Sequence, residues 1–167
     1  MIVRNIHARH FNAPREQVGS LLDGLASSAD RLWPAARWPP MRFDRPLQVG
    51  ATGGHGPIRY RVEAYEPGVK VRFRLQGPSG FDGYHAFEVL PAAGGTTLQH
   101  ALEMRARGSA MITWPLLFSP LHDALIEDCL DMAARELGEA GPHREYSRRV
   151  RLLRAGFRLL RRRAPDA

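Results

Sequence analysis

The residue best suited to chemistry in this sequence is His100, which lies in an alternating run from Thr96 to Arg107. His100 shares one side of that run with Leu98 and Leu102, whereas the other side is mostly polar or charged. We therefore expect the side with His100 to face the interior. An imidazole on an apolar wall can orient a ligand or move a proton near neutral pH. The alternative is a buried histidine that is hydrogen-bonded to a neighbouring polar group.

Tyr60 is the second candidate for a chemical role. It shares the expected inward side of another alternating run with Ile58 and Val62. A buried tyrosine hydroxyl usually has a hydrogen-bond partner, and it can donate to a ligand carbonyl. We therefore name His100 and Tyr60 as candidate acid/base groups, with plain core packing as the alternative for Tyr60.

The direction of His85 depends on how its strand is built. If Phe87 and Val89 point inward, His85 does so too, because side chains alternate along a strand. A β-bulge near Gly83 would turn His85 outward instead. The sequence permits both arrangements.

Signals for a metal, a cofactor or a covalent mechanism are missing from the sequence. The seven histidines show no zinc-ligand spacing, and there is no HExxH motif. Cys129 is the single cysteine, which excludes an internal disulfide and a cysteine-based metal site. The glycine-rich run 50–56 lacks the Lys-Ser or Lys-Thr of a phosphate-binding loop, so it is interpreted as a turn. We expect no metal and no cofactor.

Local periodicity predicts the elements that position these side chains. Alternating apolar and polar residues between glycine and proline turns predict antiparallel strands with one buried face. The clearest strands are 2–11, 58–64, 69–75, 83–90 and 96–107. Helical spacing instead marks residues 14–26 and 120–138, with prolines suited to the first helical turn at Pro14 and Pro120. Residues 110–118 are expected to add a turn or two of helix, kinked at Pro115.

These elements predict an α+β fold in which a curved antiparallel sheet wraps around a long C-terminal helix. A sheet with one apolar face needs a cover, and the apolar stripe of residues 121–137 supplies it. We expect residues 1–141 to form the ligand-binding domain and residues 142–167 to form a basic helical tail.

Four short segments, in this order, carry a resemblance to a known superfamily. They are Ala-Pro-Arg-Glu-Gln-Val at 13–18, Tyr-Glu-Pro-Gly at 65–68, Gly-Gly-Thr-Thr-Leu at 94–98 and Pro-Leu-His at 120–122. Over roughly residues 1–138 the chain resembles the polyketide cyclase and lipid-transport (SRPBCC) superfamily, which includes START domains and birch-pollen-allergen-like proteins. The resemblance implies the helix-grip fold and an apolar cavity between sheet and helix that takes a hydrophobic small molecule.

The alternation along the strands, taken with this resemblance, indicates which residues line that cavity. Trp114 precedes the last helix, near where this fold opens its cavity, so it is expected to gate the entrance or to pack in the core. The residues expected to contact a ligand are Tyr60, Phe73, Phe87, His100, Met104 and Trp114.

The excess positive charge of the chain lies in its last 25 residues. The net charge is +7, and the residues before His143 contain equal numbers of basic and acidic side chains. On a helical wheel Val150, Leu153, Phe157 and Leu160 form a stripe opposite most of the arginines. Residues 143–163 can therefore lie on an anionic membrane, bind a protein partner, or dock on the body or on a twin subunit in a homodimer. Nucleic acid is not expected, because the body adds no net charge.

The expected function is to bind or carry a hydrophobic small molecule, a lipid or a polyketide-like compound, in an internal cavity. The alternative is a polyketide cyclase or dehydratase that uses His100 and Tyr60 as acid/base groups. The first residues lack the apolar stretch of a signal peptide. We therefore expect a cytoplasmic protein, with the tail as a means of peripheral membrane attachment.

Overall fold

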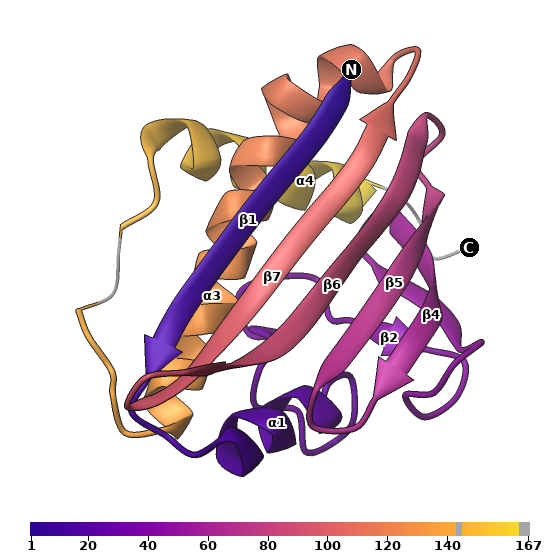
Figure 1. The fold of residues 1–167 in the computed structure, drawn as a ribbon. Coiled ribbons are helices and arrows are strands. Elements are labelled where there is room, and N and C mark those ends of the chain that lie inside the picture. Colours follow the sequence, from indigo (N-terminus) through magenta and orange to yellow (C-terminus); the bar gives the residue numbers. More distant parts are fainter. Residues whose placement is uncertain (143–144, 164–167) are drawn as a thin grey trace.

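A computed structural model describes residues 1–142 and 145–163, of which 158–163 are described as backbone only. Seven antiparallel strands form one curved sheet in the order β1-β7-β6-β5-β4-β3-β2 (Figure 1). The strands are β1 (Ile2–Phe11), β2 (Arg42–Phe43), β3 (Thr52–His55), β4 (Ile58–Glu66), β5 (Lys70–Gly77), β6 (Phe81–Ala92) and β7 (Gly95–Ala106). All five strands expected from the sequence are present, with bounds that differ by a few residues.

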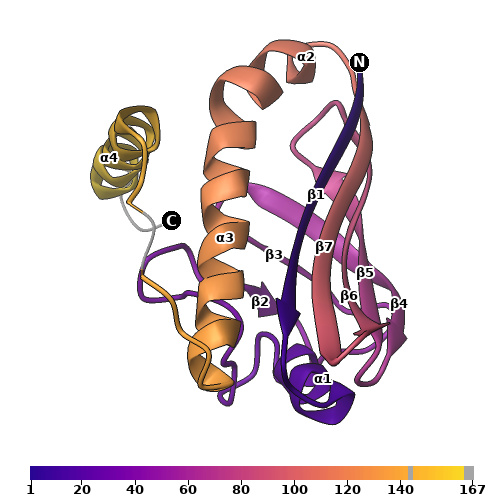
Figure 2. The ribbon, with the colours of Figure 1, turned by 60° about the vertical axis from the view of Figure 1, so that its left-hand side comes forward.

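The long helix α3 (Ser119–Glu136) lies across the hollow face of the sheet (Figure 2). Helix α1 (Arg15–Asp23) closes one end of the sheet, and α4 (Arg148–Arg163) lies on the side of α3 away from the sheet. The short helix α2 (Ala110–Thr113) and a π-helical turn η1 (Trp114–Phe118) lead into α3. Pro115 lacks an N–H group, and the wider turn accommodates it. None of the described helices has the length and apolar content to cross a membrane.

The main core lies between the sheet and α3, as the alternation predicted. Val62, Val71, Phe73 and Leu98 belong to the same buried cluster as Leu125 of α3. A second buried cluster lies near α2 and η1, and it contains Leu75, Phe81, Leu102, Met104 and Trp114. Met104 and Trp114, both expected to line the cavity, are thus in a different cluster from Tyr60 and Phe73.

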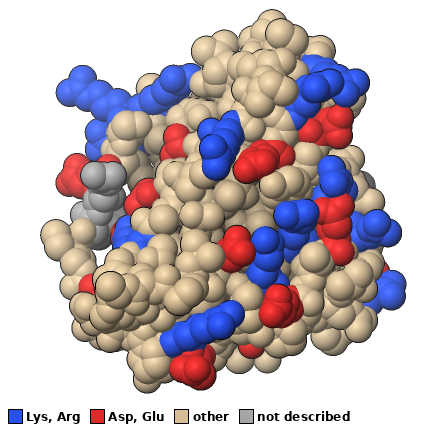
Figure 3. Space-filling model, in the orientation of Figure 1, with Lys and Arg blue, Asp and Glu red and all other residues tan. Residues whose placement is uncertain are grey.

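The outer face of the sheet carries basic and acidic side chains that alternate in sign (Figure 3). Neighbouring strands pair them across the sheet, as between Lys70 and Glu88 at 3.3 Å and between Arg74 and Glu63 at 2.8 Å. This face therefore presents no large patch of one sign.

The beginning of α4 is docked on the body through a buried aspartate of α3. Asp128 accepts hydrogen bonds from Trp38 Nε1, at 2.7 Å, and from the Tyr146 hydroxyl. Arg154 lies over the rings of Trp38 and Tyr146, at 4.5 and 4.3 Å from their centroids. In the predicted stripe Val150 is buried and Leu153 and Phe157 are half-buried, whereas the side chains of Leu160 and of the arginines from Arg158 onward lie outside the described residues.

Candidate functional site

Two histidines from neighbouring strands meet in the interior. His85 of β6 lies opposite Leu102 of β7, and His100 of β7 lies opposite Phe87 of β6. The register between β6 and β7 has no bulge, so His85 points inward with Phe87. The two imidazoles are 5% and 1% exposed, and His85 Nδ1 lies 3.3 Å from His100 Nε2. The structure therefore gives His100 a partner that the sequence did not specify.

Tyr60 of β4 extends this pair along the inner face of the sheet, toward the edge formed by β3 and β2. Its ring is fully buried and packs edge-to-face on His85, with 4.9 Å between centroids. Its hydroxyl lies 3.1 Å from His55 Nδ1. His55 comes from the glycine-rich hairpin, where nothing in the local sequence marked it as a site residue. Burial raises the pKa of Tyr60, so the hydroxyl stays protonated and can donate a hydrogen bond.

His122 continues the line on the opposite side, from the first turn of α3. Its ring centroid lies 5.1 Å from that of His100 and 5.7 Å from that of Trp114. We call this set the interior histidine row; it consists of His55, Tyr60, His85, His100 and His122. The row joins the sheet to the helix through the middle of the fold.

Several nitrogens of the interior histidine row are buried without a hydrogen-bond partner in the described part of the chain. They are His85 Nε2, His100 Nδ1 and both nitrogens of His122. Buried polar atoms are nearly always paired, because each unpaired group costs about 1–3 kcal/mol. These nitrogens therefore mark a place suited to a polar group of a ligand.

The row is electrically neutral near pH 7. Burial lowers the pKa of His85, His100 and His122, and it lowers the pKa of His55 to about 3. A neutral imidazole offers one N–H donor and one acceptor nitrogen. The row can consequently hydrogen-bond to neutral oxygens, either as donor or as acceptor.

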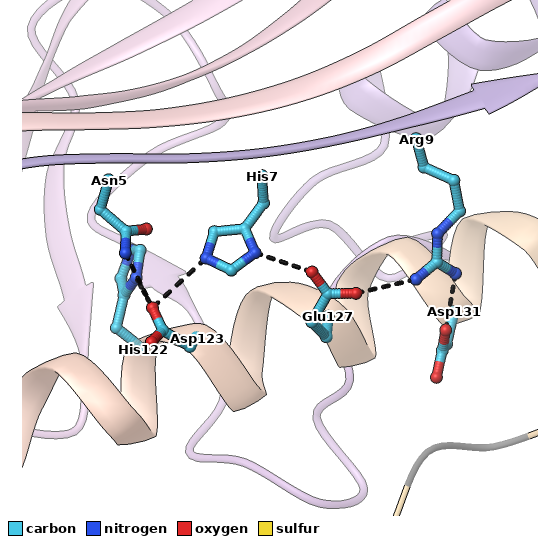
Figure 4. Close-up of polar contacts among 7 residues, drawn as sticks. All are labelled: Asn5, His7, Arg9, His122, Asp123, Glu127 and Asp131. Atoms are coloured by element: carbon cyan, nitrogen blue, oxygen red, sulfur yellow. Dashed lines mark hydrogen bonds and ion pairs between the residues drawn. The ribbon is translucent and has the colours of Figure 1, made fainter.

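A second polar set joins the edge strand β1 to α3 (Figure 4). His7 Nδ1 lies 2.7 Å from Glu127 Oε1, and Asn5 Nδ2 donates to Asp123 Oδ1 at 2.8 Å. Arg9 donates to Asp131 at 2.6 Å and to Glu127 at 3.0 Å. We call this set the β1–α3 seam; it consists of Asn5, His7, Arg9, Asp123, Glu127 and Asp131.

The seam forms because two different periodicities match in length. Every second residue of β1 faces α3, a step of about 6.8 Å along a strand. Every fourth residue of α3 faces β1, a step of about 6 Å along a helix. The sequence held this signal, with polar residues at 5, 7 and 9 and carboxylates at 123, 127 and 131, but nothing local indicated that these two elements meet.

The β1–α3 seam raises the pKa of its histidine, whereas the interior lowers the pKa values of its histidines. The hydrogen bond with Asp123 raises the pKa of His7 despite partial burial, and Glu127 adds to this effect. Burial by itself would raise the pKa of Asp123, but the neighbouring imidazoles and Asn5 together hold it well below its usual value. His7 is therefore the histidine of the site most inclined to carry a proton.

The structure brings four of the expected ligand-binding residues together, namely Tyr60, Phe73, Phe87 and His100. Two hollows, of about 400 and 390 Å³, lie at the β1–β7 edge and beside Arg9 and Glu127. Neither is lined by Tyr60 or His100, so an enclosed cavity at the row stays a prediction.

Comparison with known proteins rests on structure alone. No protein-family model matches the sequence, and no curated protein matches it. CalU16 from Micromonospora echinospora has a similar structure, with 15% identity, 96% of this chain and 95% of that chain covered, and a TM-score of 0.59. For a protein from Thermobifida fusca the values are 16% identity, 86% and 99% covered, and a TM-score of 0.63.

One similar structure belongs to a biosynthetic pathway. The di-domain ARO/CYC StfQ, from the steffimycin biosynthetic pathway, shares 12% identity, with 83% of this chain and 51% of that chain covered and a TM-score of 0.61. At such identities the similarity concerns the fold. The helix-grip fold implied by the family resemblance is thereby confirmed.

Proposed function

We propose that the protein binds a hydrophobic small molecule that carries carbonyl or hydroxyl oxygens, and that the interior histidine row holds those oxygens. The observation that carries this proposal is the set of buried, unpartnered nitrogens on His85, His100 and His122. Phe73 and Phe87, both fully buried, supply an apolar wall beside them. The fold shared with StfQ, an ARO/CYC protein of a biosynthetic pathway, supports a small-molecule ligand for this chain.

The charge of the row selects among hydrophobic ligands. Its imidazoles are neutral near pH 7, since burial lowers their pKa values. Neutral imidazoles hydrogen-bond to ketones and phenols, but they do not neutralise a carboxylate. A polyketide-like aromatic ketone therefore fits the row better than a free fatty acid.

Two probes test this preference. Alizarin, a dihydroxyanthraquinone, and oleate, a fatty acid, would be titrated into the protein by calorimetry. We expect alizarin to bind more tightly than oleate. We also expect His100→Leu to weaken alizarin binding up to about tenfold, the value of one hydrogen bond of about 1.4 kcal/mol.

The matched control for that titration is His10→Leu, because His10 lies on β1 with an exposed side chain. It should leave the affinity for alizarin unchanged. The proposal fails if the folded protein binds neither probe and carries no small molecule in native mass spectrometry. Tighter binding of oleate than of alizarin would contradict the assignment of the ligand class.

A second candidate function is acid/base catalysis of a cyclase or dehydratase type. Catalysis needs at least two polar groups that converge on one substrate atom. The sequence named His100 and Tyr60 as separate candidates, and the interior histidine row contains both. In this mechanism His100, kept neutral and next to His85, removes a proton beside a carbonyl whose oxygen accepts a hydrogen bond from Tyr60.

The catalytic candidate is tested with a thioester of a short poly-β-ketone, its products being followed by mass spectrometry. We expect the rate of conversion to fall in His100→Leu and in Tyr60→Phe, while His10→Leu keeps the rate of the unchanged protein. If the substrate binds and no product forms above the uncatalysed rate, the binding function stands and the catalytic one fails.

We propose an anionic membrane as the partner of the surface formed by α2, η1 and the start of α4. Four large apolar side chains, Met111, Ile112, Leu116 and Leu152, are 50–74% exposed. Arg149 of α4 donates to the carbonyls of Pro115 and Leu116, at 3.0 and 2.8 Å, which fastens the start of α4 beside η1. Apolar side chains next to an arginine-rich helix are typical of a surface that enters the lipid headgroup region.

Vesicle sedimentation tests the membrane proposal. Vesicles that contain phosphatidylserine should bind the protein at low salt, and added salt should weaken the binding because it screens the arginines. Ile112→Ser with Leu116→Ser should weaken it further, whereas Ile6→Ser, on an exposed position of β1, should not. A chain that ends at Gly141 should lose the binding.

A partner other than a membrane would give different results with the same variants. Equal binding of the Ile112→Ser, Leu116→Ser protein and the unchanged protein would contradict the proposal that these apolar side chains enter the membrane. Concentration-dependent dimers, lost in the same double variant, would assign the surface to a second copy instead.

A further inference from the structure

We infer that His7, His122 and Asp123 form a site for one divalent transition-metal ion, and we propose Zn²⁺ as its occupant. These residues lie where the β1–α3 seam meets the interior histidine row. Each offers one ligand atom, and the three atoms lie within 4.8 Å of one another. The inference is independent of the ligand proposed for the interior.

The spacing of the ligand atoms fits a small ion. Asp123 Oδ1 lies 3.3 Å from His7 Nε2 and 3.7 Å from His122 Nδ1. A tetrahedral Zn²⁺ with bonds of about 2.0–2.1 Å holds its ligand atoms about 3.3 Å apart. The cluster can therefore close on an ion through small side-chain movements.

His122 provides an independent reason to expect an ion. Its side chain is 15% exposed, and neither of its nitrogens has a hydrogen-bond partner among the described residues. The contact between His122 Nδ1 and Asp123 is too long for a direct hydrogen bond. A metal bond to this nitrogen would satisfy a group that the surrounding protein leaves unpaired.

The residues around the cluster are placed as supports for metal ligands. Metal-binding histidines usually give their second nitrogen to a carboxylate or a carbonyl, which fixes the ring and its tautomer. Glu127 Oε1 lies 2.7 Å from His7 Nδ1, and Arg9 holds the other oxygen of Glu127 at 3.0 Å. Asn5 steadies Asp123 through a hydrogen bond of 2.8 Å (Figure 4).

The donor set selects the class of metal. Two imidazoles and one carboxylate suit zinc and neighbouring first-row ions, whereas Ca²⁺ and Mg²⁺ prefer oxygen ligands alone. Three protein ligands leave a fourth position of a tetrahedral ion open. His122 borders His100, with 5.1 Å between ring centroids, so the ion would lie at the α3 end of the interior histidine row.

The sequence did not indicate this site because His122 and Asp123 are adjacent while the third ligand, His7, lies near the other end of the chain, which matches no known metal motif. Metal motifs place two ligands within a few residues on one element, and the remaining ligands at a set distance. Here the strand supplies position 7 and the helix supplies positions 122 and 123. The pairing of β1 with β7 and the packing of α3 bring them together.

The test uses protein without a polyhistidine tag, treated with a chelator and then dialysed. Titration with Zn²⁺ by calorimetry should give one equivalent bound. Titration with Co²⁺ should give visible absorption bands of a four-coordinate ion. In spectra of the imidazole nitrogens, Zn²⁺ should shift the signals of His7 and His122 and leave that of His85 in place.

Matched variants locate the site on the helix. Asp123→Asn and His122→Gln should each weaken Zn²⁺ binding at least tenfold, and Glu127→Gln should weaken it about 10–100-fold by loosening His7. Asp131→Asn is the control, since this seam carboxylate lies about 12 Å further along α3. It should bind Zn²⁺ as the unchanged protein does.

Three results would overturn the inference. The first is the absence of stoichiometric Zn²⁺ and Co²⁺ binding by the unchanged protein. The second is equal weakening in Asp131→Asn and Asp123→Asn, which would mean diffuse attraction to the acidic face of α3. The third is a shift of the His85 signal in place of those of His7 and His122. Circular dichroism confirms that each variant is folded, and the spectra of the unchanged protein decide the matter without any variant.

Discussion

The interior histidine row and the β1–α3 seam meet at His122, yet they affect an imidazole in opposite ways. Burial lowers the pKa of His85 and His100, which lie among aromatic rings. The hydrogen bond with Asp123 raises the pKa of His7, although the ring centroids of His7 and His122 are 6.1 Å apart. Two consecutive residues of α3, His122 and Asp123, thus belong to a region built for neutral contacts and to one built for charge.

The difference shows what each region contributes to the protein. In the seam Arg9 pairs with Glu127 and Asp131, and Asn5 and His7 contact the carboxylates of α3, so the seam holds the edge strand against the helix. In the interior histidine row several buried nitrogens lack hydrogen-bond partners among the described residues, which lowers the stability of the folded protein. We expect substitutions and pH to separate the two regions cleanly.

The largest expected effect is loss of stability in acid through the interior histidine row. The folded pKa values of His55, His85 and His100 lie below the unfolded value of about 6.5. Below pH 6.5 the unfolded chain therefore binds more protons than the folded one, so the free energy of unfolding decreases as the pH is lowered. His55, whose folded pKa is about 3, should remove about 2 kcal/mol between pH 6.5 and 5, at about 1.4 kcal/mol per pH unit, and His85 and His100 should add to the loss in the same direction.

Urea unfolding between pH 7.5 and 5 measures this loss. A protein with His85→Phe and His100→Leu should show a shallower dependence on pH, because two of the groups that take up protons on unfolding are gone. Equal slopes for the two proteins would show that the interior imidazoles are not the source, and the contrast between row and seam would fail.

A smaller effect is expected from the seam. Arg9→Met leaves Glu127 and Asp131 without the guanidinium that both of them contact. Since these groups are 20–32% exposed, we expect a loss of about 1–2 kcal/mol in the free energy of unfolding. The control is Arg4→Met, whose ion pair with Glu103 is long and well exposed, and it should change stability by less than about 0.5 kcal/mol. Equal losses in the two variants would mean that the Arg9 contacts stabilise the fold no more than an ordinary exposed ion pair does.

The smallest effect is expected where two histidines are replaced together. At pH 7.5 the His85→Phe, His100→Leu protein should unfold within about 1 kcal/mol of the unchanged protein, because apolar groups of similar size remove unpaired nitrogens. Alizarin binding should nevertheless be lost. A large loss of stability would instead identify the pair as a structural element of the core.

Much of the fold could be predicted from the sequence, because it depends on local periodicity. The alternation at 58–64 and 96–107 places Tyr60 and His100 inward, and the helical spacing of 121–137 gives α3. The partners of these residues could not be predicted in the same way. His55 joins Tyr60 through a short hairpin, and Asp128 is buried against Trp38, ninety residues away in the chain. Local patterns say which side of an element is buried, but not which other element covers it.

The sheet order has a consequence for how the protein is made. Strands β2 to β7 each pair with the strand before or after them in the chain, but β1 pairs with β7, so Val3 lies opposite Met104. β1 is therefore synthesised well before its partner β7, and its seam contacts form only once α3 has been made as well. Such long-range pairing slows folding and leaves an unpaired strand edge exposed in the meantime. Arg4 and Arg9 place positive charge on both sides of that waiting strand, and charge on a strand edge opposes pairing with other chains.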